Sequence, residues 1–118
     1  MKYLCLIHFD EKKLEAMSET ELAALDNESL GYDELLRKNG HFIAAQALQP
    51  AAASTTIRVR SGKISVTDGP FAETNEQLGG FILIEANDLN EAIQLASKIP
   101  VAKFGNVEIR PIKELTRK

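Results

Sequence analysis

The chain has 118 residues and a net charge of −3, from 14 basic and 17 acidic residues, and 44% of its residues are hydrophobic. This length suits one domain covering residues 1–118, and the composition is that of an ordinary globular protein. Without a long basic run, nucleic-acid binding is disfavoured, and no apolar run is long enough to span a bilayer. The first residues lack the length and cleavage site of a signal peptide, so we expect a cytoplasmic protein.

The first predicted element is a buried strand over residues 3–8, a near-continuous apolar run. It contains Cys5, the single cysteine, which excludes an intrachain disulfide and favours a small buried hydrophobe over a nucleophile. Residues 9–17 are expected to form a polar connection. Ser18 and Glu21 then match a capping box, which predicts a helix that ends with Lys38-Asn39-Gly40.

The middle of the chain is predicted to be mostly strand. Residues 41–48 alternate as a strand that Pro50 ends, and residues 51–54 are expected to be a linker rather than a helical turn. Residues 55–60 and 63–67 alternate on either side of Ser61-Gly62, a pattern typical of a β-hairpin. Arg58 and Arg60 share one face of its first strand.

The last third predicts one more helix between two strands. Residues 81–85 are an apolar run typical of a buried strand. Asp88 and Glu91 mark a helix start, and Pro100 is expected to stop that helix. Residues 107–112 alternate as a final strand with Pro111 near its end or on an edge, and residues 113–118 are expected to be a solvated tail.

The order of elements predicts an α+β fold. Without the hairpin the order is βαββαβ, the ferredoxin-like split-βαβ plan with an antiparallel sheet. Two helices would cover one face of this sheet. The other face would still carry apolar groups, so we expect face-to-face dimerisation into a dimeric α+β barrel and a homodimer in solution.

A long motif carries a family resemblance. The stretch DGPFAETNEQLGGF, residues 68–81, closely resembles the signature of DGPF-domain proteins in the YCII-related family. The resemblance extends over nearly the whole chain, from Met1-Lys2-Tyr3-Leu4 to Ala96-Ser97-Lys98-Ile99-Pro100. It implies a dimeric ferredoxin-like barrel and little about activity, although some members are encoded near extracytoplasmic-function sigma factors. Asn75 stands where the pattern usually has lysine, which would weaken binding of any anionic ligand that the lysine held.

The resemblance also implies an active site built from a His/Asp pair in a pocket, which matches His8 and Asp68 here. A strand-end imidazole suits general acid–base catalysis because it titrates near neutral pH. Alternatively, His8 is a strand-end residue bonded to the backbone, and Asp68 is an acceptor in an Asx-type turn.

Other candidates for a ligand site have an ordinary structural reading beside the functional one. Phe71 is more typical of a core plug than of a ligand platform, and Glu73, Glu76 and Gln77 of a solvated turn than of a pocket wall. Gln46 lies on an apolar strand face and would need a partner if buried, which makes it a pocket candidate. Arg58 could bind an anion across a dimer, but such residues are usually solvated.

No metal and no organic cofactor are expected. Two histidines far apart and one cysteine make a weak metal case, of which His8, Asp68 and Glu73 would be the best set. The double glycine Gly79-Gly80 lacks the further glycines and lysine of a phosphate loop, and suggests a bulge or a close backbone approach.

Three functions remain open from the sequence. The first is a small-molecule enzyme that uses the His8/Asp68 pair for acid–base chemistry. The second is a non-catalytic ligand-binding or regulatory module, associated with a sigma-factor system. The third is a structural dimer in which the DGPF stretch only shapes the interface.

Overall fold

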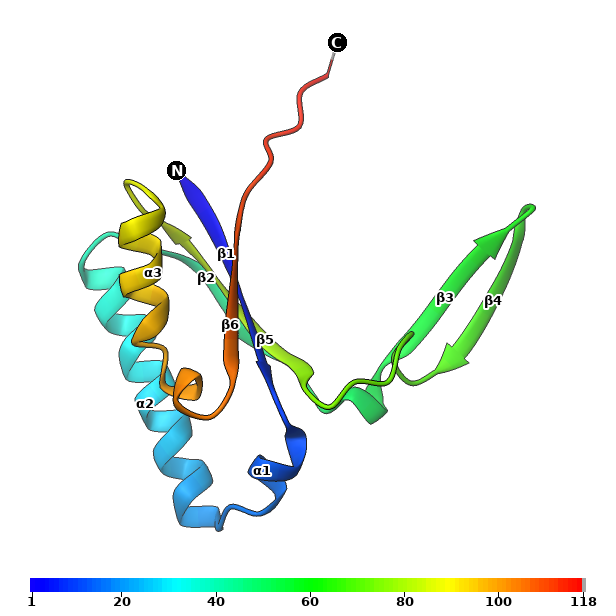
Figure 1. Cartoon of the computed structure of the whole chain (residues 1–118), viewed down its shortest axis with the longest axis horizontal. Helices are drawn as coiled ribbons and strands as arrows, with labels where there is room; N and C mark the ends of the chain where they lie inside the picture. Colours follow the sequence, from blue (N-terminus) through cyan, green and yellow to red (C-terminus); the bar gives the residue numbers. More distant parts are fainter. Residues whose placement is uncertain (118) are drawn as a thin grey trace.

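The computed structural model describes residues 1–117; Lys118, the end of the predicted solvated tail, lies outside the described residues. Residues 113–117 are exposed and extend beyond the folded body (Figure 1). The strands and helices, in chain order, are β1 Lys2–Phe9, α1 Glu11–Glu15, α2 Glu19–Lys38, β2 Phe42–Ala47, η1 Ala51–Ala53, β3 Thr55–Arg60, β4 Lys63–Asp68, β5 Gln77–Glu85, α3 Leu89–Ser97, η2 Pro100–Lys103 and β6 Asn106–Pro111.

Strands β2, β5, β1 and β6 form a four-stranded sheet in that order, and all neighbours are antiparallel. With the hairpin set aside, this is the ferredoxin-like order, so the fold prediction is confirmed. Helices α2 and α3 lie on one face of the sheet (Figure 1). Pro111 is the last residue of the edge strand β6, as the sequence predicts for a residue that cannot donate to a ladder.

The core lies between the sheet and these two helices. Alternate residues of β1 and β5 point into it, and the helices contribute small residues that allow close approach. Its buried members include Tyr3, Cys5, Ile7, Phe9, Leu36, Ile82, Ile84, Ala92 and Ala96. The Tyr32 hydroxyl donates to the Leu95 carbonyl and ties α2 to α3.

The predicted helix boundaries are confirmed by their caps. Ser18 accepts from the Glu21 amide while Glu21 accepts from the Ser18 amide, which completes the capping box. Asp88 accepts from the Glu91 amide at the start of α3. After α2, Gly40 takes a φ of +80°, a conformation that glycine adopts without strain.

Three local predictions were wrong. The expected polar connection contains α1, which begins when Asp10 accepts from the Lys12 amide. Residues Ala51–Ala53 form the 3₁₀ turn η1 rather than a linker, because the Ala53 amide donates to the Pro50 carbonyl. Strand β5 begins at Gln77, earlier than the apolar run suggested, because backbone pairing with β1 extends through the double glycine.

The second face of the sheet, which we call the open face, carries apolar side chains without a cover from the described chain. Leu4 and Leu6 of β1 stand opposite Leu83 and Phe81 of β5, and all four are half-buried. Alternation along the strands directs these residues away from the helices. This is the apolar face that the sequence predicted to need a partner.

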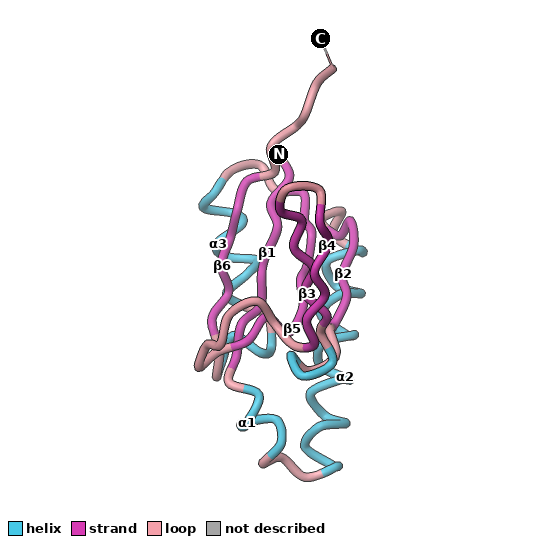
Figure 2. Tube along the Cα trace, turned by 90° about the vertical axis from the view of Figure 1, so that its right-hand side faces the viewer, coloured by secondary structure: helices cyan, strands magenta, loops and turns pink. Residues whose placement is uncertain are grey.

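The hairpin of β3 and β4, which we call the arm, projects away from the sheet (Figure 1). In the perpendicular view of Figure 2 the arm points towards the viewer and overlaps the sheet. Ser61 and Gly62 have φ angles of 50° and 75°, typical of the tight turn that the sequence predicted. Four apolar residues share one face, paired Ile57 with Val66 and Val59 with Ile64, and they are 53–70% exposed. The radius of gyration is 16.4 Å, against about 13.5 Å expected for a compact chain of this length.

None of the helices within residues 1–117 is both long enough and apolar enough to cross a membrane.

Candidate functional site

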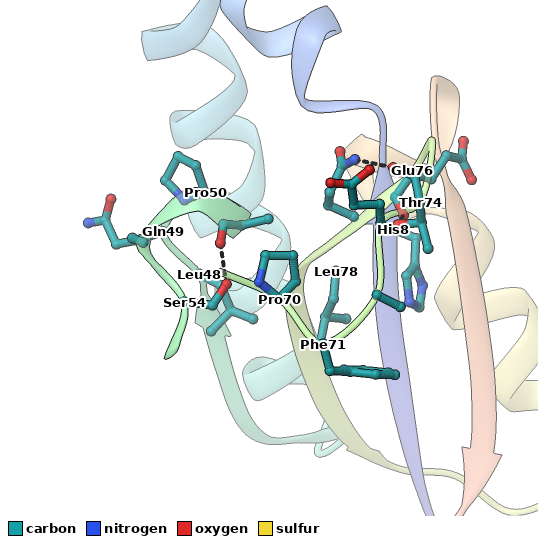
Figure 3. A pocket seen from close by; sticks show the side chains of 15 residues that line it. His8, Leu48, Gln49, Pro50, Ser54, Pro70, Phe71, Thr74, Glu76 and Leu78 are labelled. Atoms are coloured by element: carbon teal, nitrogen blue, oxygen red, sulfur yellow. Dashed lines mark hydrogen bonds between the residues drawn. The ribbon is translucent and has the colours of Figure 1, made fainter. Parts of the chain in front are cut away.

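A pocket of about 810 Å³ opens where the arm joins the sheet (Figure 3). Its walls come from the end of β1, from the segment between β2 and β3, and from the loop that leads from the arm into β5. The lining residues are His8, Leu48, Gln49, Pro50, Ala51, Ala53, Ser54, Pro70, Phe71, Ala72, Glu73, Thr74, Glu76, Gln77 and Leu78.

His8 reaches the pocket because it is the last open-face residue of β1. The alternation that buries Ile7 and Phe9 places His8 on the opposite side, beside Leu78 in the β5 register. The register between β1 and β5 shifts after Ile7, where the extra residue Gly79 forms a bulge. His8 is half-buried, and within residues 1–117 its imidazole makes no hydrogen bond.

The double glycine allows this bulge, as the sequence suggested. A Cβ at Gly79 would lie 2.0 Å from the Phe9 ring, and one at Gly80 would lie 2.8 Å from the Gln46 carbonyl oxygen. Both distances are too short for any side chain. The glycines therefore permit the close packing of β5 against its neighbours beside the pocket.

The short helix α1 braces two pocket walls. The Glu11 carboxylate accepts from the Ala51 amide at 2.8 Å, and the Glu11 amide donates to the Gln77 side chain at 3.1 Å. Gln77 in turn donates to the Thr74 carbonyl. Both ends of the Gln77 amide are thus occupied, so Gln77 lines the pocket mainly as a brace for its loop.

The DGPF stretch forms a turn that sets the direction of the loop between the arm and β5. Gly69 has a φ of +96°, its amide donates to the Ser54 carbonyl at 2.7 Å, and its carbonyl accepts from the Thr56 hydroxyl at 2.8 Å. Beyond this turn the Phe71 side chain is 80% exposed at the pocket wall. The preference for Phe71 as a core plug was therefore wrong: the turn directs the ring away from the core.

Glu76 is connected to His8 through a hydrogen bond to a neighbouring residue. Its Oε1 accepts from the Asn106 side-chain amide, and Asn106 is the residue paired with His8 across β1 and β6. Within residues 1–117 the Glu73 carboxylate has no hydrogen bond and no ion pair. Glu73 and Glu76 thus both present carboxylate oxygens at the pocket.

Of the residues predicted to form a site, the structure brings together His8, Phe71, Glu73 and Gln77 at this pocket. Asp68 ends β4 at the base of the arm, where it is exposed, and it does not line the pocket. Arg58 is exposed on the polar face of the arm. Gln46 is exposed in β2, paired with Phe81.

The wall formed by residues 48–54 was missed from the sequence. Those residues come to the site because β2 pairs with β5, and the Leu48 amide donates to the Gly79 carbonyl at 2.9 Å. Only the Pro50 and alanine run hinted at an ordered turn there. Glu11 was also missed, because it belongs to the helix that the sequence did not reveal.

The one cysteine of the chain lies away from the pocket. Burial raises the pKa of the Cys5 thiol to about 11, and Cys5 lies in the core on the opposite side of the sheet. Among residues 1–117, no three His, Cys, Asp or Glu side chains are grouped so that they could hold a metal ion.

Comparison with known proteins identifies the family. The model of the YCII-related domain matches residues 1–116. An uncharacterized protein of Rhizobium meliloti (strain 1021) is 34% identical over 114 residues, which cover 95% of this chain and 92% of that protein. Among solved structures, the 5-chloro-2-hydroxyhydroquinone dehydrochlorinase TftG of Burkholderia phenoliruptrix AC1100, in complex with 2,5-dihydroxybenzoquinone, is 16% identical with a TM-score of 0.49, and the alignment covers 96% of this chain and 94% of that one.

Proposed function

This chain belongs to the YCII-related family, and we propose that it is a cytoplasmic small-molecule enzyme in which His8 acts as general acid and base in the pocket. The observation that carries the proposal is the placement of His8: a half-buried imidazole at a strand end, without a hydrogen-bond partner in residues 1–117, in the wall of a cavity. A histidine with both ring nitrogens unoccupied can exchange a proton with a bound molecule.

The pocket is of suitable size and composition for a small organic ligand. Its volume of about 810 Å³ lies within the range of roughly 300–1,000 Å³ that is common for such sites. The apolar part of the wall includes Leu48, Pro70, Phe71 and Leu78, and the polar part includes His8 and the two glutamates. A flat apolar group would pack on the first set while its polar substituents faced the second.

His8 would take a proton from a hydroxyl or an activated carbon of the substrate and return it to the product. Glu76 is hydrogen-bonded to Asn106, the β6 partner of His8, and in this proposal it would orient a substrate hydroxyl or stabilise the protonated imidazole. Asp68 remains the predicted partner of His8, but a direct contact would require the base of the arm to shift towards the pocket. Variants of Glu76 and of Asp68, made one at a time, distinguish which of the two carboxylates acts with His8.

The proposal includes a homodimer formed through the open face. Leu4, Leu6, Phe81 and Leu83 present a continuous apolar surface on the side of the sheet that bears His8. Exposed apolar surfaces of this kind are typical of protein interfaces. A partner sheet packed there would also enclose the pocket, because Phe71 and Leu78 are 80% and 42% exposed in one chain. Binding of nucleic acid or a membrane is not part of the proposal.

A second candidate is a non-catalytic ligand-binding or regulatory module, working beside a sigma-factor system. The arm supports it, because a two-stranded hairpin with four exposed apolar residues gains stability from a protein partner. In that case the same pocket would bind a ligand without converting it.

A metabolite screen distinguishes the two candidates. Compounds that raise the melting temperature are incubated with the wild-type protein and with the variant His8→Gln, and products are followed by NMR. The enzyme is supported if the variant binds but no longer converts a compound that the wild-type protein converts. Binding without conversion by the wild-type protein for every compound would favour the module.

A further inference from the structure

We propose that the pocket selects neutral or cationic ligands that donate hydrogen bonds, and that it rejects carboxylates and phosphates. This inference rests on the proposed function, since it specifies the ligand class of the same site. It comes from the charges and the hydrogen bonds of the lining residues.

The first observation is the charge of the wall. Within residues 1–117 no lysine and no arginine lines the pocket, whereas Glu73 and Glu76 do. His8 is the single described lining residue that can become positively charged. Two carboxylates repel an anionic ligand and attract a cationic one.

The second observation is that three side-chain donors at the wall already have acceptors within the chain. The Ser54 hydroxyl donates to the Ala51 carbonyl, the Thr74 hydroxyl donates to the Glu76 carbonyl, and the Gln77 amide donates to the Thr74 carbonyl. Figure 3 shows the side chain of Gln49 directed away from the other pocket side chains. A ligand therefore meets few free side-chain donors on the described wall.

The third observation is that acceptors remain free. The Glu73 carboxylate has no partner in residues 1–117, and Glu76 uses Oε1 for Asn106 while Oε2 has no described partner. Ionised carboxylates only accept hydrogen bonds. A ligand satisfies them with hydroxyl, amino or ammonium groups, and its apolar part then packs on Phe71 and Leu78. The ligand class is thus a small apolar or aromatic molecule with such donors.

Three probes of one shape test this directly: benzylamine, benzyl alcohol and benzoate, each titrated into the full chain and followed by the amide NMR signals of Ser54, Thr74 and Leu78. We expect benzylamine and benzyl alcohol to shift these signals, and benzoate to bind about tenfold more weakly than benzylamine, as two partly exposed carboxylates would impose. In the variant Glu73→Gln, benzylamine binding should weaken about threefold, while benzyl alcohol binding stays the same. Glu114→Gln, with the same charge change in the exposed tail, is the matched control and should leave all three unchanged.

The outcomes separate this inference from the proposed function. Benzoate shifting the pocket signals as strongly as benzylamine would overturn the ligand class and leave a pocket that binds small molecules. Equal weakening of benzylamine by Glu73→Gln and Glu114→Gln would overturn it as well, because the effect would then be one of net charge. If none of the probes and no metabolite in the screen shifted these signals, the proposed function itself would fail.

Discussion

Gly105 directly precedes β6, and its lack of a side chain lets the start of β6 lie close to the backbone of His8. A Cβ at Gly105 would lie 2.3 Å from the His8 carbonyl oxygen and 3.0 Å from the Phe9 Cβ. Because the closer atom belongs to the backbone of a central strand, it cannot rotate away. The substitution Gly105→Ala must displace β1 or the turn that precedes β6. Overpacking of this kind costs typically about 1–3 kcal/mol, and a backbone clash belongs at the upper end.

For a chain of this length, about 3 kcal/mol corresponds to a melting temperature lower by roughly 12 °C. Gly31→Ala is the matched control, since Gly31 lies within α2 and nothing lies within 4 Å of its added Cβ. It should raise stability by about 1 kcal/mol through helix propensity. The assay is thermal unfolding followed by circular dichroism at one protein concentration. A Gly105→Ala variant that melts within about 2 °C of the wild-type protein, less than the shift expected from 1 kcal/mol, would refute the close approach at His8.

Three further predictions concern the core and the open face. Tyr32→Phe removes the hydrogen bond that the Tyr32 hydroxyl donates to the Leu95 carbonyl, and it should lower the free energy of unfolding by about 1 kcal/mol. A urea titration measures this, and an unchanged midpoint would contradict this bond between α2 and α3. Burial raises the pKa of Cys5 from 9.0 to about 11, so Cys5 should resist iodoacetamide at pH 8 until the chain is unfolded. The stability that its neutral thiol contributes should be complete below pH 9 and lost as the pH rises towards 11. Rapid alkylation of the native protein would show instead that Cys5 is accessible. Leu6→Lys should convert a dimer into a folded chain of 13.0 kDa in light scattering, and a dimer that persists would exclude the open face as the interface.

The sheet and the two longer helices could be predicted because their signals are local. Each cap joins residues three apart, such as Ser18 with Glu21, and each strand shows its own alternation. Helix α1 has no such signal: it spans one turn, has no buried residue, and is set by the Asp10 cap. A five-residue helix of this kind is marginal by itself. Glu11, with its bonds to two distant segments, supplies the tertiary support.

The candidate site was only half predictable. His8 could be named because the family resemblance implies a histidine at this position, and a strand end suits a functional side chain. The motif that follows the arm marked Phe71 and Glu73. The wall at Leu48 could not be found, since it depends on β2 pairing with β5 across the sheet. The position of Asp68 depends on the direction of the arm, which no periodicity in the sequence specifies.

The DGPF stretch acts in this structure first as a turn. Gly69 supplies the positive φ, and the bonds to Ser54 and Thr56 fix the turn between the arm and the pocket. Pro70 and Phe71 then enter the wall, while Asp68 stays outside it. The turn thus has a structural role that also shapes the pocket wall. The third hypothesis from the sequence, a structural dimer in which the DGPF stretch only shapes the interface, stays a prediction.

The most direct test of the central claim is turnover by His8→Gln, measured beside binding. A compound found in the metabolite screen is titrated into both proteins while the Ser54, Thr74 and Leu78 amides are observed, and its conversion is followed in the same samples. We predict that the compound shifts these amides in both proteins and that only the wild-type protein converts it. Conversion at the wild-type rate by His8→Gln, or binding that leaves the three amides unchanged, would contradict an acid–base site at this pocket.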